Sequence, residues 1–203
     1  MAERIAQPTG ISKQRIEALS DGIYAIALTL LVLELRLPEA AHHTNDQALR
    51  GMLMELLPKG LTWLLSFWVM ALFWLAQQRQ YRLCLNLDST LLKIELTQLS
   101  LISLFPFSNA LMGMHGNLVT SAVIYSAHLL AIALLSWLRI ARVMRHGELH
   151  SPDMSPALAE GLRLRAMTFS GSALAALLLA FVIPGWNMLA MLATLVVPRL
   201  ARH

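Results

Sequence analysis

The chain has 203 residues, of which 57% are hydrophobic and 14% charged, and its formal net charge is +4. Soluble globular chains average about 45–50% apolar and about 25% charged residues. The apolar excess here falls in long blocks, which excludes a soluble domain and predicts an integral membrane protein. The positive residues lie between these blocks as topology signals, so nucleic-acid binding is not expected.

Six apolar blocks follow one another, and each predicts a transmembrane helix. They cover residues 18–37, 56–77, 91–112, 118–143, 162–183 and 186–197. About 20 residues cross a bilayer, so the last block spans only if Arg199 and Arg202 reach the interface. The first 17 residues lack the short apolar core of a cleaved signal peptide. The sequence predicts an all-α, six-transmembrane-helix bundle in one domain, residues 1–203.

Lysine and arginine residues predict the orientation, because cytoplasmic segments carry the positive excess. With six spans, only Arg36, Arg50 and Lys59 lie on the far side. All other Lys and Arg residues, Arg139 among them, then lie on the side of both termini, which is predicted to be cytoplasmic. Five spans would leave the C-terminal arginines on the far side.

The first block carries the most informative pattern. On a helical wheel, an aliphatic stripe is formed by Leu19, Gly22, Ile23, Ile26, Leu30, Leu33 and Leu37. Asp21 points to the opposite side. A carboxylate at a membrane entry is costly unless it faces protein and has a partner. Asp21 is therefore expected to contact another helix, and the stripe to face lipid, a packed helix or a pore. Periodicity alone favours lipid or packing.

This block resembles the first helix of the transmembrane protein 175 family, the lysosomal potassium channels and their prokaryotic relatives. The shared pattern comprises Arg15, Ser20, Asp21, Ala25, Ile26, Thr29, Leu30, Leu33 and Glu34. Weaker matches follow at Ser66, Phe67, Trp74, Leu104, Phe105, Pro106, Phe107 and Tyr125. The departures are Leu19 for phenylalanine, Gln77 and Gln78 for two histidines, and Thr97 near a common asparagine. Glutamine can donate to Asp21 but cannot titrate, which puts pH sensitivity in doubt.

The resemblance implies a bacterial homotetramer in the inner (plasma) membrane, with four copies of the first helix around a central pore. It implies K⁺ as the permeant ion, no cofactor and no metal. The family's constriction maps onto Ile26, Leu30 and Leu33, which already share the aliphatic stripe. The chain has no TVGYG-like carbonyl filter, so selectivity would come from the cost of stripping water in an aliphatic passage. Glu34 would lie at the pore mouth, or be a solvated helix-end carboxylate.

In this account the polar residues of the first helix are structural. Arg15, Ser20 and Asp21 would join it to later helices. Their candidate partners are Trp74, Gln77 and Gln78. A competing role for Trp74 is that of an aromatic anchor at the membrane interface.

Other classes of function stay open. A secondary transporter is typically marked by midplane charge or broken helices, and this chain has Pro106 but little midplane charge. A non-conducting scaffold needs no stripe opposite Asp21. An enzyme is not expected, because no nucleophile has a histidine and carboxylate partner. His128, within the fourth block, is expected to be satisfied by a neighbouring helix.

Overall fold

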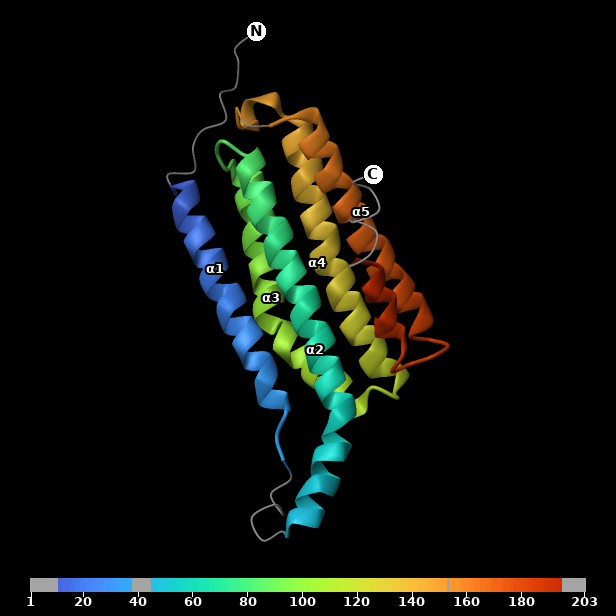
Figure 1. Ribbon diagram of the computed structural model, residues 1–203. Helices are drawn as coiled ribbons and strands as arrows, with labels where there is room; N and C mark the ends of the chain where they lie inside the picture. The colour runs from blue at the N-terminus through green and yellow to red at the C-terminus, as the bar shows by residue number, and fades with distance from the viewer. Residues whose placement is uncertain (1–10, 38–44, 153, 195–203) are drawn as a thin grey trace.

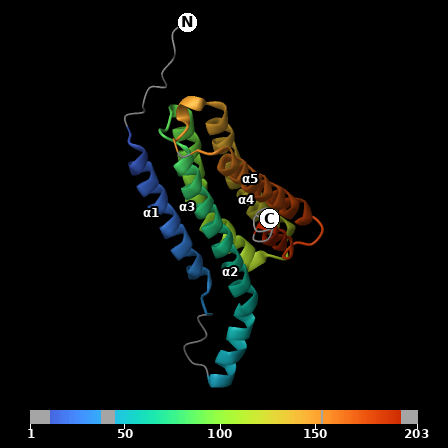
Figure 2. The same cartoon turned by 45° about the horizontal axis from the view of Figure 1, so that its top comes forward.

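The computed structural model describes residues 11–37, 45–152 and 154–194. The elements are α1 (Lys13–Leu30), η1 (Leu31–Glu34), α2 (Asp46–Leu83), α3 (Ser89–His115), α4 (Val119–Arg145), η3 (Gly147–Leu149), α5 (Pro156–Leu179) and η4 (Asn187–Leu192), where η marks a 3-10 helix. Helices α2 to α5 form a bundle, and α1 lies along one side of it, against α3 and α2 (Figures 1 and 2). The predicted all-helical membrane fold is thus confirmed in its class.

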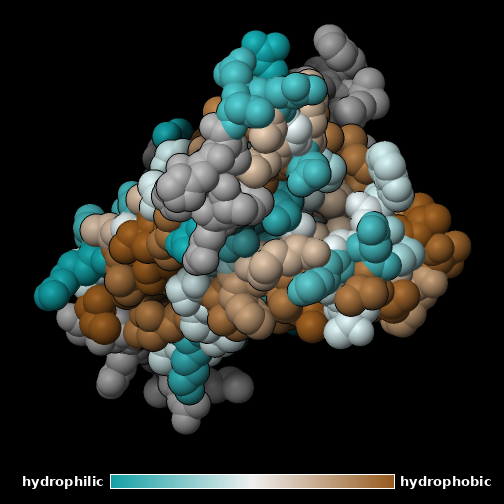
Figure 3. Space-filling model, turned by 90° about the horizontal axis from the view of Figure 1, so that it is seen from below, coloured by the Kyte–Doolittle hydropathy of each residue, from teal (hydrophilic) through white to brown (hydrophobic). Residues whose placement is uncertain are grey.

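Five helices of the described residues are long and apolar enough to cross a membrane. They cover Lys13–Glu34, Asp46–Leu83, Ser89–His115, Val119–Arg145 and Pro156–Leu179. Hydrophobic side chains accordingly reach the outer surface on both sides of the bundle (Figure 3). The apolar blocks of the sequence therefore locate these five helices, with different boundaries.

The sixth predicted span has a different form over its described part. Residues 187–192 form the 3-10 helix η4, which packs against α5 and α4. Gly185, with φ 90°, makes the turn that leads into it, a conformation that L side chains avoid. Residues 195–197, Arg199 and Arg202 lie outside the described residues, so a sixth span stays a prediction.

Helix boundaries follow caps rather than hydropathy. Asn45 Oδ1 accepts from Ala48 N at 2.9 Å and begins α2 ten residues before the predicted apolar block. Asp88 Oδ1 accepts from Leu91 N at 2.7 Å and begins α3. Each cap satisfies a backbone N–H that the first turn leaves free. A helix of 38 residues is about 57 Å long, so the start of α2 projects beyond the bundle (Figure 1).

The connections gather at two ends of the bundle. One end of the bundle, called the basic end here, holds the α2–α3 and α4–α5 connections. There Leu85 N donates to Leu149 O at 2.9 Å, which pairs the two connections. Lys13 Nζ donates to Cys84 O at 2.8 Å, which places the start of α1 at this end too. The opposite end holds the α3–α4 turn and Gly185.

Two hydrophobic clusters fill the bundle, one centred on Tyr24, Phe105 and Tyr125 and one at the basic end around Leu83 and Leu91. A band of polar side chains lies between them along α2.

Candidate functional site

The two sides of α1 differ in what covers them. One side is buried against the bundle through Ile16, Ser20, Tyr24, Ala27 and Leu31. Most of the aliphatic stripe lies on the uncovered side. Its large exposed members are Leu19, Ile26, Leu30, Leu33 and Leu37, at 44%, 61%, 38%, 48% and 41% exposure. The helix thus carries a ridge of aliphatic side chains that no other part of the described chain covers.

Three details of the ridge depart from the predicted helix over residues 18–37. The α-helix ends at Leu30, and η1 tightens the next four residues. Leu33 stays beside Leu30, because residues three apart eclipse in a 3-10 helix. Ile23 is half-buried and packs against the main core, so it lies at the edge of the stripe.

Asp21 is bound by two donors from α2. Trp74 Nε1 donates to Asp21 Oδ1 at 2.8 Å, and Gln78 Nε2 donates to the same oxygen at 2.5 Å. Trp74 and Gln78 are four residues apart and share one face of α2. Arg15 is exposed and makes no ion pair with Asp21 in the part of the chain that the structure describes. The structure therefore brings Asp21, Trp74 and Gln78 together and leaves Arg15 apart.

Ser20 leads into a buried polar network. Gln77 Nε2 donates to Ser20 Oγ at 2.7 Å and is also within reach of Glu95. Tyr24 Oη donates to Gln77 Oε1 at 3.0 Å, and Tyr81 Oη donates to Glu95 Oε1. Because Gln77 both donates and accepts, this one residue of α2 connects α1 to α3.

A buried ion pair completes the network and corrects one statement made from the sequence, the placement of Arg139 in a loop. Arg139 Nη1 pairs with Glu95, and Arg139 Nε donates to Gln80 Oε1 at 2.6 Å. Arg139 is 1% exposed and Glu95 0%. Arg139 is therefore no topology arginine in a loop but a buried residue of α4.

Sequence reasoning missed Glu95, although a signal was present. Glu95 is a carboxylate inside an apolar block, and the argument applied to Asp21 requires a partner for it as well. Gln77, Gln80 and Tyr81, at spacings of three and four on α2, mark the helix face that supplies the neutral partners.

The remaining candidates lie apart from the network. His128 Nδ1 lies 2.8 Å from Ser108 Oγ and its Nε2 lies 2.9 Å from Leu101 O, so neighbouring α3 satisfies it, as predicted. Glu34 is half-buried at the end of η1. Among the described residues, no three His, Cys, Asp or Glu side chains are placed to hold a metal ion.

Fold and site define a multi-pass helical membrane protein whose first helix is fixed by polar contacts on one side and bare on the other. The family model of the endosomal/lysosomal potassium channel TMEM175 matches residues 15–106. The crystal structure of a lysosomal potassium-selective channel TMEM175 homolog from Chamaesiphon minutus superposes with a TM-score of 0.71 and 26% identity, over 93% of this chain and 96% of that one. The resemblance stated from the sequence is confirmed: a little under half of the chain matches the TMEM175 family model, and the fold is similar to that of a TMEM175 homolog over most of its length.

Two curated relatives are named potassium channels. Cha6605_3372 of Chamaesiphon minutus is 34% identical over 125 residues, 60% of this chain and 61% of the relative. B446_29190 of Streptomyces collinus is 28% identical over 156 residues, 74% of each chain. The match thus spans less than two thirds of the first relative's length. The potassium channel MtTMEM175, in a variant form, superposes at a TM-score of 0.59 with 15% identity, which shows the fold alone.

Proposed function

We propose that the protein is a potassium-permeable cation channel whose pore is lined by α1 and η1 of four copies. The exposed aliphatic ridge carries this proposal. The ridge runs from Leu19 to Leu30 over 11 residues of α-helix, about 17 Å, and η1 carries it about 6 Å further to Leu33, so it covers most of the ~30 Å of a hydrocarbon core. A ridge of this length on a helix that is otherwise anchored suits a pore wall.

Assembly is part of the proposal. One copy contributes one such helix, and a single helix cannot enclose a pore. The number four rests on the family resemblance, and the relatives' names support K⁺ as the permeant ion. No cofactor is required.

The constriction would be built by rings of Ile26, Leu30 and Leu33. Aliphatic rings offer an ion no ligands, so it crosses with part of its hydration lost and little compensation. That favours potassium over sodium, because K⁺ gives up water more cheaply, and the preference should be modest. A small inward movement of the same rings would expel water and close the pore. Glu34, at the end of η1, would draw cations to the mouth.

The polar contacts of α1 would set its rotation. Asp21 is held by Trp74 and Gln78, and Ser20 by Gln77. These contacts approach α1 away from the ridge and so leave the ridge toward the pore. Because glutamine does not titrate, Gln77 and Gln78 would confer no pH dependence on this anchoring.

The membrane setting follows from charge. The Lys and Arg excess favours cytoplasmic termini in a multi-pass bacterial inner (plasma) membrane protein. In that orientation the basic end faces the cytoplasm and Glu34 the outside.

The test is cation flux from potassium-loaded liposomes with K⁺ and then Na⁺ outside. Leu30→Ala and Ile26→Asn, both at exposed positions, should change the rate or the K⁺/Na⁺ ratio severalfold. Leu174→Ala on α5, at a position 47% exposed, is the matched control and should behave like the parent protein. Absence of flux in folded, assembled protein and in both variants would reject the channel and favour a scaffold.

A second candidate, an ion-coupled carrier, is favoured by the buried pair of Glu95 and Arg139, because charges inside a bundle often mark transport pathways. We rank it below the channel, since each charge is already matched by the other. A carrier would lose transport in Glu95→Gln and show counter-exchange. A channel would pass ions down either gradient without exchange.

A further inference from the structure

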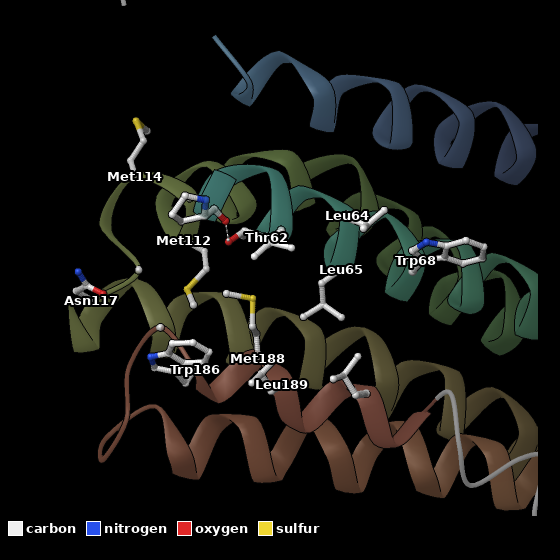
Figure 4. Close-up of a pocket in the computed structure, with 16 residues that line it drawn as sticks. Thr62, Leu64, Leu65, Trp68, Met112, Met114, Asn117, Trp186, Met188 and Leu189 are labelled. Carbon is white, nitrogen blue, oxygen red and sulfur yellow. Dashed lines mark hydrogen bonds between the residues drawn. The ribbon is translucent and has the colours of Figure 1, made fainter. Parts of the chain in front are cut away.

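A groove of about 540 Å³ lies between α2 and η4, with the end of α3 as its floor. In Figure 4, Leu65 from α2 and Met188 and Leu189 from the η4 segment face the same space, and Met112 closes it from α3. This groove belongs to no part of the proposed pore, because α1 and η1 contribute none of its lining.

One wall of the groove follows α2, from Pro58 to Trp68, ten residues or about 15 Å along the helix. Because α2 is long and apolar enough to cross a membrane, this wall extends across the bilayer rather than along its plane. Acyl chains of lipids run in the same direction.

Polarity changes along the groove. Trp68 and Leu65 lie toward the middle of the bundle. At the other end, Asn117 and the exposed Trp186 lie beside the α3–α4 turn, where the helices end (Figure 4). A tryptophan lies at each end of the groove, so the ring alone does not distinguish the two ends; Asn117 and the helix ends at the α3–α4 turn supply the polar groups beside Trp186. The groove is thus apolar at membrane depth and polar at the membrane boundary.

The turn that carries this polar end is tightly packed. A Cβ on Gly185 would come within 3.3 Å of Asn117 Oδ1 and 3.4 Å of Gly116 O. Only a glycine with φ 90° brings the η4 segment this close to the α3–α4 turn. The η4 wall is therefore packed closely against the α3–α4 turn at this end of the groove.

From these observations we infer that the groove binds one acyl chain of a membrane phospholipid, with the headgroup beside Asn117 and Trp186, in the leaflet at the opposite end from Lys13. Bilayer and groove are equally apolar, so burial of the chain alone does not select it. An empty groove, however, leaves its lining without dispersion partners, and a chain restores them. The polar end then retains the lipid in preference to its neighbours.

The test uses a phospholipid with a photoreactive diazirine in one acyl chain, incorporated with the full-length protein into nanodiscs. After illumination, peptide mapping should place the label on residues 58–68 and 186–192. Gly113→Leu fills the floor of the groove at a position where a Cβ meets nothing within 4 Å. It should lower labelling of these peptides severalfold, because the leucine side chain occupies the space of the acyl chain.

Gly171→Leu on α5 is the matched control, because its Cβ also meets nothing within 4 Å and it does not line the groove. It should label like the parent protein. Unchanged labelling in Gly113→Leu, or label spread evenly over all lipid-facing helices, overturns the proposal. So does cross-linking of the groove to a second copy of the chain. If Gly113→Leu elutes as misfolded protein, Leu189→Trp fills the groove from η4 and decides the question. None of these readouts depends on ion flux.

Discussion

Removal of one partner of the buried Glu95–Arg139 pair should be strongly destabilising. Arg139→Met keeps an unbranched apolar stem, removes the guanidinium and leaves Glu95 without its charged partner in a fully buried position. Breaking a buried pair in this way typically costs about 3–5 kcal/mol. Glu95 still receives the neutral donors Tyr81 and Gln77, so we place the loss of unfolding free energy near the lower limit, at about 3 kcal/mol.

The assay is unfolding of the purified protein in mixed detergent micelles, followed by circular dichroism. A loss of about 3 kcal/mol corresponds to roughly 6–12 °C in Tm for a chain of this size. Arg142→Met is the matched control. Arg142 pairs with Asp88 at 2.6 Å, but its side chain is 30% exposed, so its loss should cost about 1 kcal/mol.

The double variant Glu95→Gln with Arg139→Met tests the reasoning itself. Removing both charges leaves no uncompensated ion, so stability should return to within about 1 kcal/mol of the parent protein. A double variant as unstable as Arg139→Met would refute the electrostatic explanation. A single variant no worse than Arg142→Met would refute it equally.

Three shorter predictions concern other parts of the molecule. Trp74→Phe removes a hydrogen-bond donor from the Asp21 carboxylate and should lower the free energy of unfolding by about 1.5–3 kcal/mol in the same assay. Trp68 lies on an exposed face of α2, so the control Trp68→Phe should lower it by less than half of that amount. Burial raises the pKa of the Cys84 thiol from 9.0 to about 11, so the fraction of thiolate at pH 7 should be roughly 100-fold lower than for a free cysteine. Alkylation of Cys84 by iodoacetamide at pH 7 should be slower by the same factor, and its rate should rise with pH. Rapid labelling of the folded protein at pH 7 would contradict this. Glu34→Gln should lower single-channel conductance at low salt and leave it nearly unchanged at 1 M salt, because screening then removes the attraction; an equal loss at both concentrations would count against a role at the pore mouth.

The features predicted well from the sequence depend on local periodicity and composition. Five apolar blocks locate five helices, and the wheel of the first block separates the ridge of Ile26 and Leu30 from the side of Asp21. That Asp21 contacts another helix follows from a simple cost, since a carboxylate at a membrane entry needs a donor, whereas the choice of Trp74 as its candidate partner rests on the family resemblance.

The features that the sequence did not reveal depend on distant partners or on capping. Arg139 lies near the end of its block, where counting of positive charges treats it as part of a loop, and its partner Glu95 is 44 residues away. The early start of α2 at Asp46 comes from Asn45, a polar cap on a polar segment with no hydropathy signal. The turn before η4 depends on the φ of Gly185, which composition does not report.

The ion pair also bears on how the chain is synthesised. Glu95 enters the membrane with α3, before Arg139 has been translated, and an uncompensated charge in a membrane helix costs up to about 3 kcal/mol. The short turn around Gly116 lets α3 and α4 enter together as a helical hairpin, in which the two charges neutralise each other. The translocon should therefore retain α3 until α4 emerges, and a nascent chain released after α3 should insert poorly. The pair thus makes insertion of this part of the protein a single event for two helices.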